Sequence, residues 1–315
     1  MKKHNSFKAI KFAVGAALLA FSASFFSCKS TPDLAPVDAF ELLDGDAALY
    51  LTIPVQANAN FVTSAIQKVA KVAQSDAAKI TERLEMAYVA VGANGEMQLS
   101  VSGKIPTTMV SFALTEKKGW KASALEQQVC YTHSHTLYQL CLPSSSNAFL
   151  SHNIEPMVKR YNKIAYAGFS DEILAKNKKL DSDSILSSKN SDVKILSENL
   201  KELDYKFLHE NLKSDIMLYS PNPRIFIRNF LGAVDVNTSI SSIYANIRPY
   251  KEVKGYDYNV RLVLNLSDAR TVKATEALLK VGLFGMAAKI SQTGQSQITI
   301  VDLLLTKNQI LSLIK

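Results

Sequence analysis

Cys28 is the residue whose chemistry the sequence specifies most directly. It follows the small residue Ser27 and stands after a short apolar segment that begins behind a basic N-terminus. A bacterial lipoprotein signal is cut immediately before such a cysteine, which becomes the new N-terminus and is acylated on its thiol. The sequence therefore predicts a lipoprotein with palmitate or a related chain on Cys28.

The segment before Cys28 has the composition of an export signal. Four lysines and no acidic residue surround the start of the apolar run Phe12–Phe21, which is too short to span a bilayer stably. Phe25 and Phe26 depart from the usual lipobox and are similar to the relaxed lipoboxes of spirochaetes. The alternative is ordinary cleavage after Ser24. In either case we expect the chain to be exported.

Cys130 and Cys141 are a second candidate for covalent chemistry. They flank a stretch whose alternating pattern around His133 and His135 predicts a tight β-hairpin, with the two cysteines facing each other across the strands. In an exported protein such a pair forms either a disulfide or two buried thiols, and the sequence leaves both states open.

Further catalytic or metal-binding chemistry is not expected. His133 and His135 share a strand face, but no carboxylate or other histidine lies at a useful spacing, so we predict no metal site. The chain has no nucleophile elbow, glycine-rich phosphate loop or paired carboxylates that would indicate an enzyme. We expect no cofactor other than a bound phospholipid or fatty acid.

The charge of the chain limits its partners. The formal net charge is +8, four of these charges belong to lysines of the signal segment, and no dense Lys/Arg cluster follows. Nucleic acid is therefore not expected as a partner. The sequence does not specify the oligomeric state.

The pattern of elements predicts an α+β fold with mixed or antiparallel sheets and amphipathic helices packed on them. An internal duplication is indicated by four residues that recur at one constant offset: Asp46, Leu49, Tyr50 and Pro54 against Asp215, Leu218, Tyr219 and Pro223. We expect five segments: a signal peptide at 1–27, a lipidated tether at 28–45, a first α+β half at 46–169, a polar, partly helical or mobile excursion at 170–214, and a second α+β half at 215–315.

Several elements can be placed within these halves. Asn94-Gly95 is a strong hairpin signal between strands at 86–93 and 96–103. We further expect helices at 61–73 and 154–161, a weak helical stripe at 195–212, a hairpin of 239–250 with 256–266, a helix from 268 to about 289 and a strand at 297–301.

Two apolar segments are the most informative for function. In the segment 223–234, helical spacing gathers Phe226, Ile227, Phe230 and Leu231 on one face, opposite Arg228. In the segment 272–288, Lys273, Glu276 and Lys280 form one narrow polar stripe on an otherwise apolar helix. Such helices either pack under a sheet or lie in a membrane interface with their basic side chains reaching outward. Neither is long enough to cross a bilayer.

The chain resembles the family of treponemal concealed outer-membrane lipoproteins. The resemblance is carried by the segments 45–54, 79–84, 87–90, 118–120 and 256–266. It extends over most of residues 45–315 in order and fails across 170–214. It implies an α/β body with open and closed forms around an apolar cavity, phospholipid binding and insertion of amphipathic helices into the inner leaflet of the outer membrane, on the periplasmic side.

Transferred to this chain, the resemblance implies inserting helices at 61–73, 224–234 and 272–288. The predicted lipid contacts are Phe61, Val62, Ile66, Val69, Phe226, Ile227, Phe230, Leu231, Leu278, Leu279, Leu283, Phe284 and Met286, with Arg224, Arg228 and Lys280 at the headgroups. We expect a non-enzymatic, lipid-anchored outer-membrane protein that binds glycerophospholipid and alters permeability or moves lipid. The alternatives are a surface-displayed interaction protein or adhesin, and a periplasmic carrier of a small apolar ligand.

Overall fold

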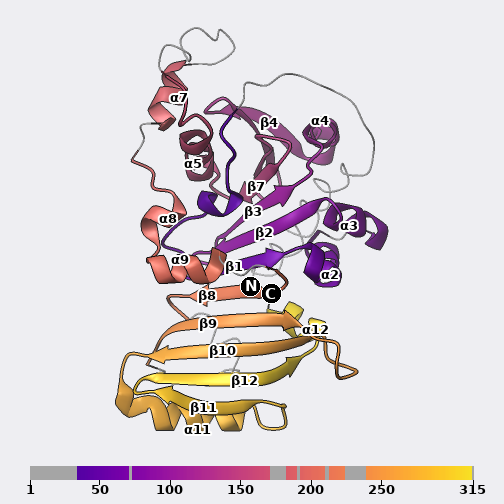
Figure 1. Ribbon diagram of the computed structural model, residues 1–315. Coiled ribbons are helices and arrows are strands. Elements are labelled where there is room, and N and C mark those ends of the chain that lie inside the picture. Colours follow the sequence, from indigo (N-terminus) through magenta and orange to yellow (C-terminus); the bar gives the residue numbers. More distant parts are fainter. Residues whose placement is uncertain are drawn as a thin grey trace, which may run out of the picture. The chain divides into compact units, whose positions relative to one another are not determined.

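The computed structural model describes most of the chain after the predicted tether. The described residues are 34–70, 73–170, 182–189, 192–209, 213–223 and 239–313. They form helices and antiparallel strands, and they divide into two compact units that interleave along the sequence (Figure 1). The predicted α+β class is confirmed. The segment boundaries predicted at 169 and 214 stay predictions.

The first unit contains residues up to Gly45 together with 59–88 and 96–201. Its strands follow the order β2-β3-β7-β6-β5-β4. These are β2 (Leu84–Val91, whose last three residues belong to the second unit), β3 (Met97–Gly103), β7 (Asn147–Ser151), β6 (Gln139–Cys141), β5 (Gln128–His133) and β4 (Trp120–Leu125). Its helices are α2 (Ala59–Ala70), α3 (Gln74–Thr81), α4 (Thr107–Ala113), α5 (Glu155–Ala165), α7 (Ser182–Lys189) and α8 (Leu196–Asn199), preceded by the 3-10 helix η2 (Ala39–Leu42).

The core of the first unit combines large apolar side chains with one buried cation. Trp120, Phe149 and Tyr161 are almost completely buried. Arg160 of α5 is also buried, and it donates to the carbonyl oxygens of Leu42 at 3.1 Å and Lys194 at 2.9 Å, and forms an ion pair with Asp44. A buried guanidinium needs such partners because an unpaired charge is costly to desolvate. These bonds tie α5 to the segments beside η2 and α8.

The second unit contains residues 46–58, 89–95 and 202–315. Its strands follow the order β11-β12-β10-β9-β8-β1. These are β11 (Lys289–Gly294), β12 (Gln297–Leu305), β10 (Tyr258–Leu266), β9 (Ile240–Pro249), β8 (Ile216–Ser220) and β1 (Leu49–Pro54). The helices are α9 (Glu202–His209), α11 (Val272–Gly282) and α12 (Lys307–Leu313), with the 3-10 turns η3 (Gln56–Asn58) and η5 (Ala269–Thr271).

The two segments that suggested a duplication lie side by side in the second unit. β1 pairs with β8 in antiparallel fashion, and Tyr50 stands directly opposite Tyr219, its counterpart in the sequence comparison. Their rings stack with centroids 6.2 Å apart. The pairing thus brings together the two residues that the sequence comparison aligned, and the internal duplication itself stays a prediction.

The hairpin predictions are confirmed. Asn94-Gly95 lies between β2 and β3, and Gly95 has a φ of +84°, which a residue without a side chain adopts at little cost. β9 and β10 pair from Ile240 to Pro249 with the turn at Lys254-Gly255 between them. Thr107–Ala113 forms the short helix α4.

Three helix predictions need correction. The helix expected at 268–289 ends at Gly282, because the chain turns at 283–287 with Gly285 at a φ of +83°, and Lys289 already begins β11. The helix expected at 61–73 is α2, which ends at Ala70. The stripe expected at 195–212 is divided between the short helices α8 and α9, so that Leu196 is buried whereas Leu203 is exposed.

Candidate functional site

Helix α11 has three distinct faces along its length. Val272, Thr275, Leu279 and Leu283 follow a spacing of three or four residues and are each at most 5 % exposed. This stripe packs α11 onto β11 and β12 of the second unit (Figure 1). It is the ordinary core-facing stripe of an amphipathic helix.

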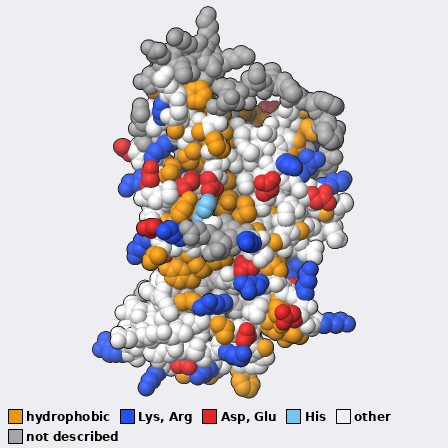
Figure 2. All heavy atoms as spheres, in the orientation of Figure 1, with side chains coloured by type: hydrophobic (Ala, Val, Ile, Leu, Met, Phe, Trp, Pro, Cys, Tyr) orange, Lys and Arg blue, Asp and Glu red, His pale blue; other side chains and the backbone are white. Residues whose placement is uncertain are grey.

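A second apolar face of α11 remains open to solvent. Leu278 is 45 % exposed, Val281 76 % and Phe284, just after the helix, 90 %. Ala274 and Ala277 extend this face toward the start of the helix and are also exposed. In Figure 2 hydrophobic side chains reach the surface at the lower edge of the second unit, where Figure 1 places α11, with basic side chains around them. Adjacent exposed apolar residues of this kind mark a contact surface.

Charged residues separate the two apolar faces on one side. Lys273, Glu276 and Lys280 form this band, and the Lys280 Nζ lies 2.7 Å from Glu276 Oε1, a favourable arrangement with the acid four residues before the base. Lys280 is long enough to extend its ammonium group beyond the exposed apolar face. α11 therefore has one apolar face toward the sheet and another toward solvent, with the charged band between them.

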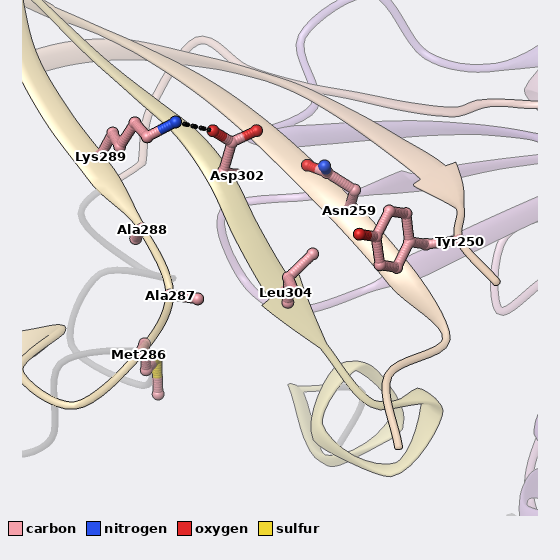
Figure 3. A pocket seen from close by; sticks show the side chains of 8 residues that line it. All are labelled: Tyr250, Asn259, Met286, Ala287, Ala288, Lys289, Asp302 and Leu304. Atoms are coloured by element: carbon pink, nitrogen blue, oxygen red, sulfur yellow. Dashed lines mark hydrogen bonds and ion pairs between the residues drawn. The ribbon is translucent and has the colours of Figure 1, made fainter. Parts of the chain in front are cut away.

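A pocket of about 460 Å³ lies beside the end of this exposed face. It is lined by the segment that follows α11 and by residues of β10 and β12, among them Met286, Asn259 and Leu304, with Tyr250 on a further wall. Figure 3 shows Lys289 and Asp302 together at one end of the pocket and Met286 at the other. The pocket thus has a charged end and an apolar end.

The charged end is set by an ion pair between neighbouring strands. Lys289 Nζ donates to Asp302 Oδ2 at 2.8 Å. The hydrogen bond and the attraction between the charges raise the pKa of the Lys289 ammonium and lower the pKa of the Asp302 carboxyl. Both groups are therefore charged across the neutral pH range.

The structure divides the predicted lipid-contacting residues of α11 into two groups. Leu278, Phe284 and Met286 are exposed, whereas Leu279 and Leu283 are buried against the sheet, because they occupy the stripe shared with Val272 and Thr275. Lys280, predicted at the headgroups, is exposed in the charged band. Val281 was not among the predicted contacts although it lies one helical turn from Leu278; helical spacing alone could have found it.

The residues predicted on α2 are mostly covered by the fold. Phe61 and Val62 are 4 % and 7 % exposed, and Ile66 is half-buried. Val69 lies in the helix, but its side chain is outside the described residues. Other predicted residues also lie outside the described part of the chain: Cys28, Arg224, Phe226, Ile227, Arg228, Phe230 and Leu231. For all these residues, lipid contact or lipidation stays a prediction.

Cys130 and Cys141 face each other as the sequence predicted. They are register partners on β5 and β6, both are buried, and this structure holds them as two thiols. Burial raises the pKa of the Cys141 thiol well above its ordinary value. His133 is buried and packs edge-on against Trp120 with ring centroids 4.9 Å apart, so it belongs to the core of the first unit.

The described part of the chain contains neither a membrane-spanning helix nor a metal-binding cluster. No helix among them is both long and apolar enough to cross a membrane. No group of three or more His, Cys, Asp or Glu side chains within the same ranges could hold a metal ion.

Comparison with known proteins identifies similar chains. A family model described as "Outer membrane-associated lipoprotein TP0453" matches residues 34–311. Crystal forms III, I and IV of TP0453 are similar structures, with TM-scores of 0.63, 0.61 and 0.59 at 18 % identity. Each alignment covers 89 % of this chain and 97–98 % of the other. At this identity the structural likeness shows a shared fold. No curated protein sequence matches the chain significantly.

Proposed function

The chain belongs to the TP0453 family of outer membrane-associated lipoproteins, and on that premise we propose that it binds glycerophospholipid by inserting the exposed face of α11 into the membrane interface. The observation that carries the proposal is the second apolar face of this helix, which the fold leaves uncovered while the first face packs on the sheet. A helix that spans no bilayer can still lie in its surface.

The size of the exposed face is sufficient for such binding. Full burial of one large apolar side chain contributes about 1.5–3 kcal/mol. Leu278, Val281, Phe284 and Met286 are between 41 % and 90 % exposed, so their burial among acyl chains contributes several kcal/mol together. Lys280 then reaches the phosphate level beside them.

A lipid anchor changes what this helix does. With acyl chains on Cys28, attachment to the outer membrane does not depend on α11, since two membrane signals already give stable binding. The helix instead alters the leaflet into which it inserts, which agrees with a role in permeability or lipid movement. We place this contact at the inner, periplasmic leaflet.

Vesicle binding of the unacylated protein tests the proposal. The mature chain with Cys28→Ser should float with phospholipid vesicles, and Val281→Asp combined with Phe284→Asp should reduce its affinity more than about tenfold, because two carboxylates cannot enter the apolar layer without a large cost. Phe112→Asp is the matched control, since Phe112 of α4 is 79 % exposed but lies outside α11.

Two outcomes would contradict the proposal. Equal flotation of the double variant and the parent protein would exclude insertion through α11. Co-purification of lipid without any vesicle binding would instead favour a periplasmic carrier of an apolar ligand. Circular dichroism of each variant verifies that the fold is retained.

A further inference from the structure

The pocket at the end of α11 contains polar groups that the proposed insertion does not require. It holds both signs of charge at one end, through Lys289 and Asp302, and apolar side chains at the other, through Met286 and Leu304. Tyr250 adds one aromatic ring, and Asn259 a side-chain amide. A surface made only for acyl chains needs none of these polar groups.

The backbone at Asp302 is arranged in an unusual way. Asp302 has a φ of +57°, in the left-handed region, although it lies within β12. The pairing of β10 with β12 shifts register at this point, between Val260 and Leu262, as in a β-bulge. A bulge re-aims a side chain, and left-handed conformations of residues other than glycine concentrate at functional sites. Here the bulge directs the carboxylate toward Lys289 and the pocket (Figure 3).

The ion pair is accessible to a ligand. The side chains of Lys289 and Asp302 are 80 % and 50 % exposed. An exposed ion pair contributes little to stability, because water screens it and both side chains lose freedom. Separating the two side chains to admit a ligand therefore costs little free energy. A ligand with one positive and one negative group then forms two ion pairs in place of the one that it breaks.

The distance between the exposed apolar face and the charged end of the pocket matches the distance between acyl chains and headgroups. Met286, which is 41 % exposed, and Lys289 are three positions apart, a distance of at most about 10 Å along an extended chain. An interfacial helix buries its apolar face about 5–10 Å into the boundary between headgroups and acyl chains. Once Phe284 and Met286 enter the apolar layer, Lys289 and Asp302 lie at the level of phosphate and amine groups.

We propose that this pocket binds the headgroup of an amine-bearing phospholipid, with Lys289 paired to the phosphate and Asp302 paired to the primary ammonium. The inference rests on the proposed function, because the pocket reaches headgroups only when α11 contacts a membrane. Phosphatidylethanolamine is the simplest lipid with these two groups. It satisfies both charges of the pocket, whereas an anionic lipid such as phosphatidylglycerol leaves the carboxylate unpaired.

A primary amine fits the pocket better than the quaternary amine of choline. An ammonium group donates N–H bonds to a carboxylate, and such charge-assisted bonds are the stronger kind. A quaternary amine has no N–H group and is recognised instead by several aromatic rings arranged as a cage. Among the residues that line the pocket, Tyr250 is the one aromatic side chain.

The test compares the lipid preference of matched variants in the mature, unacylated chain. One set of vesicles contains phosphatidylcholine with a fixed minor fraction of phosphatidylglycerol, and in the other set half of the phosphatidylcholine is replaced by phosphatidylethanolamine. The parent protein should bind the second set about threefold more tightly, which is the scale of one surface ion pair. Asp302→Asn and Lys289→Gln should each remove this preference, measured within each variant as the ratio of its affinities for the two sets of vesicles.

The variants are chosen to keep the fold. Asparagine tolerates the left-handed conformation at position 302 better than other polar residues do. Lys254→Gln, in the exposed turn between β9 and β10, removes the same charge at a residue that does not line the pocket and should keep the preference. A loss of preference in Lys254→Gln would show a general charge effect and overturn the proposal.

The remaining outcomes separate the two proposals. A preference that persists in Asp302→Asn and Lys289→Gln overturns headgroup binding while α11 insertion stands. If the parent protein binds no vesicles, insertion fails, and soluble glycerophosphoethanolamine tests the pocket alone. Chemical-shift changes in β11 and β12 that disappear in Asp302→Asn then support the pocket, and their absence overturns it.

Discussion

Helices α2 and α11 are both predicted to insert into membranes, but they differ in how much of their apolar surface the fold covers. In α2 the large apolar side chains Phe61 and Val62 are buried, and the helix packs against α3, with Thr63 and Thr81 hydrogen-bonded at 3.0 Å. In α11 one apolar stripe is buried and a second, with Val281 at 76 % exposure, faces solvent.

The difference shows that apolar content alone does not identify an inserting helix. α2 carries Thr63, Ser64 and Gln67 on its remaining surface. Of its large apolar side chains, Phe61 and Val62 are buried and Ile66 is half-buried. In α11 the stripe needed by the sheet leaves Leu278 and Val281 unused. A helix with more apolar surface than the core can cover keeps an excess that is available for a membrane or a partner.

Phe61→Ala should produce the largest change in stability. Truncation of a buried phenylalanine typically lowers the free energy of unfolding by about 3–5 kcal/mol, through lost burial and a residual cavity. Phe284→Ala, at a side chain that is 90 % exposed, should change it by less than about 0.5 kcal/mol. Urea denaturation followed by circular dichroism measures both. Similar losses in the two variants would show that Phe284 also packs in the fold.

Leu279→Ala and Leu278→Ala separate the two faces of α11 with one type of substitution. Leu279 is 5 % exposed, so its truncation should cost about 2–5 kcal/mol of unfolding free energy. Leu278→Ala should cost much less, because that side chain is 45 % exposed, and it should instead lower vesicle affinity several-fold. Urea denaturation and vesicle flotation give the two readouts. Reversed effects would place the core on the other face of α11.

Lys280→Gln should have the smallest effect. It removes the ion pair with Glu276, and such pairs on a helix contribute about 0.2–0.5 kcal/mol. We expect an almost unchanged urea midpoint and weaker binding to anionic vesicles at low salt, with no difference at high salt, where the attraction is screened. Weaker binding that persists at high salt would contradict a headgroup role for this lysine.

The organisation of elements could be predicted because local sequence determines it. Asn94-Gly95 located the hairpin of β2 and β3, since the turn requires a residue that accepts positive φ. The alternation around His133 predicted that Cys130 stands opposite Cys141, because a tight hairpin fixes which residues of its two strands are partners. Tyr50 and Tyr219, which the sequence comparison aligned, lie on strands that the structure pairs directly.

Only part of the candidate site could be predicted from the sequence. The apolar richness of 272–288 predicted an amphipathic helix in this segment, but helical periodicity cannot distinguish which of two apolar faces the sheet covers. Leu279 and Leu278 are neighbours of the same type, and only packing onto β11 and β12 buries the first and exposes the second. The pair of Lys289 and Asp302 was missed because it depends on strand register and on a bulge.

The sequence by itself determined the antiparallel hairpins, the α+β class and the existence of an amphipathic helix after β10, because turn chemistry and hydrophobic period act between residues close along the chain. The tertiary structure decided which apolar surface remains uncovered and where the charges beside it meet. Those properties depend on how much apolar area a particular sheet can bury, and residues far apart in the chain set that area.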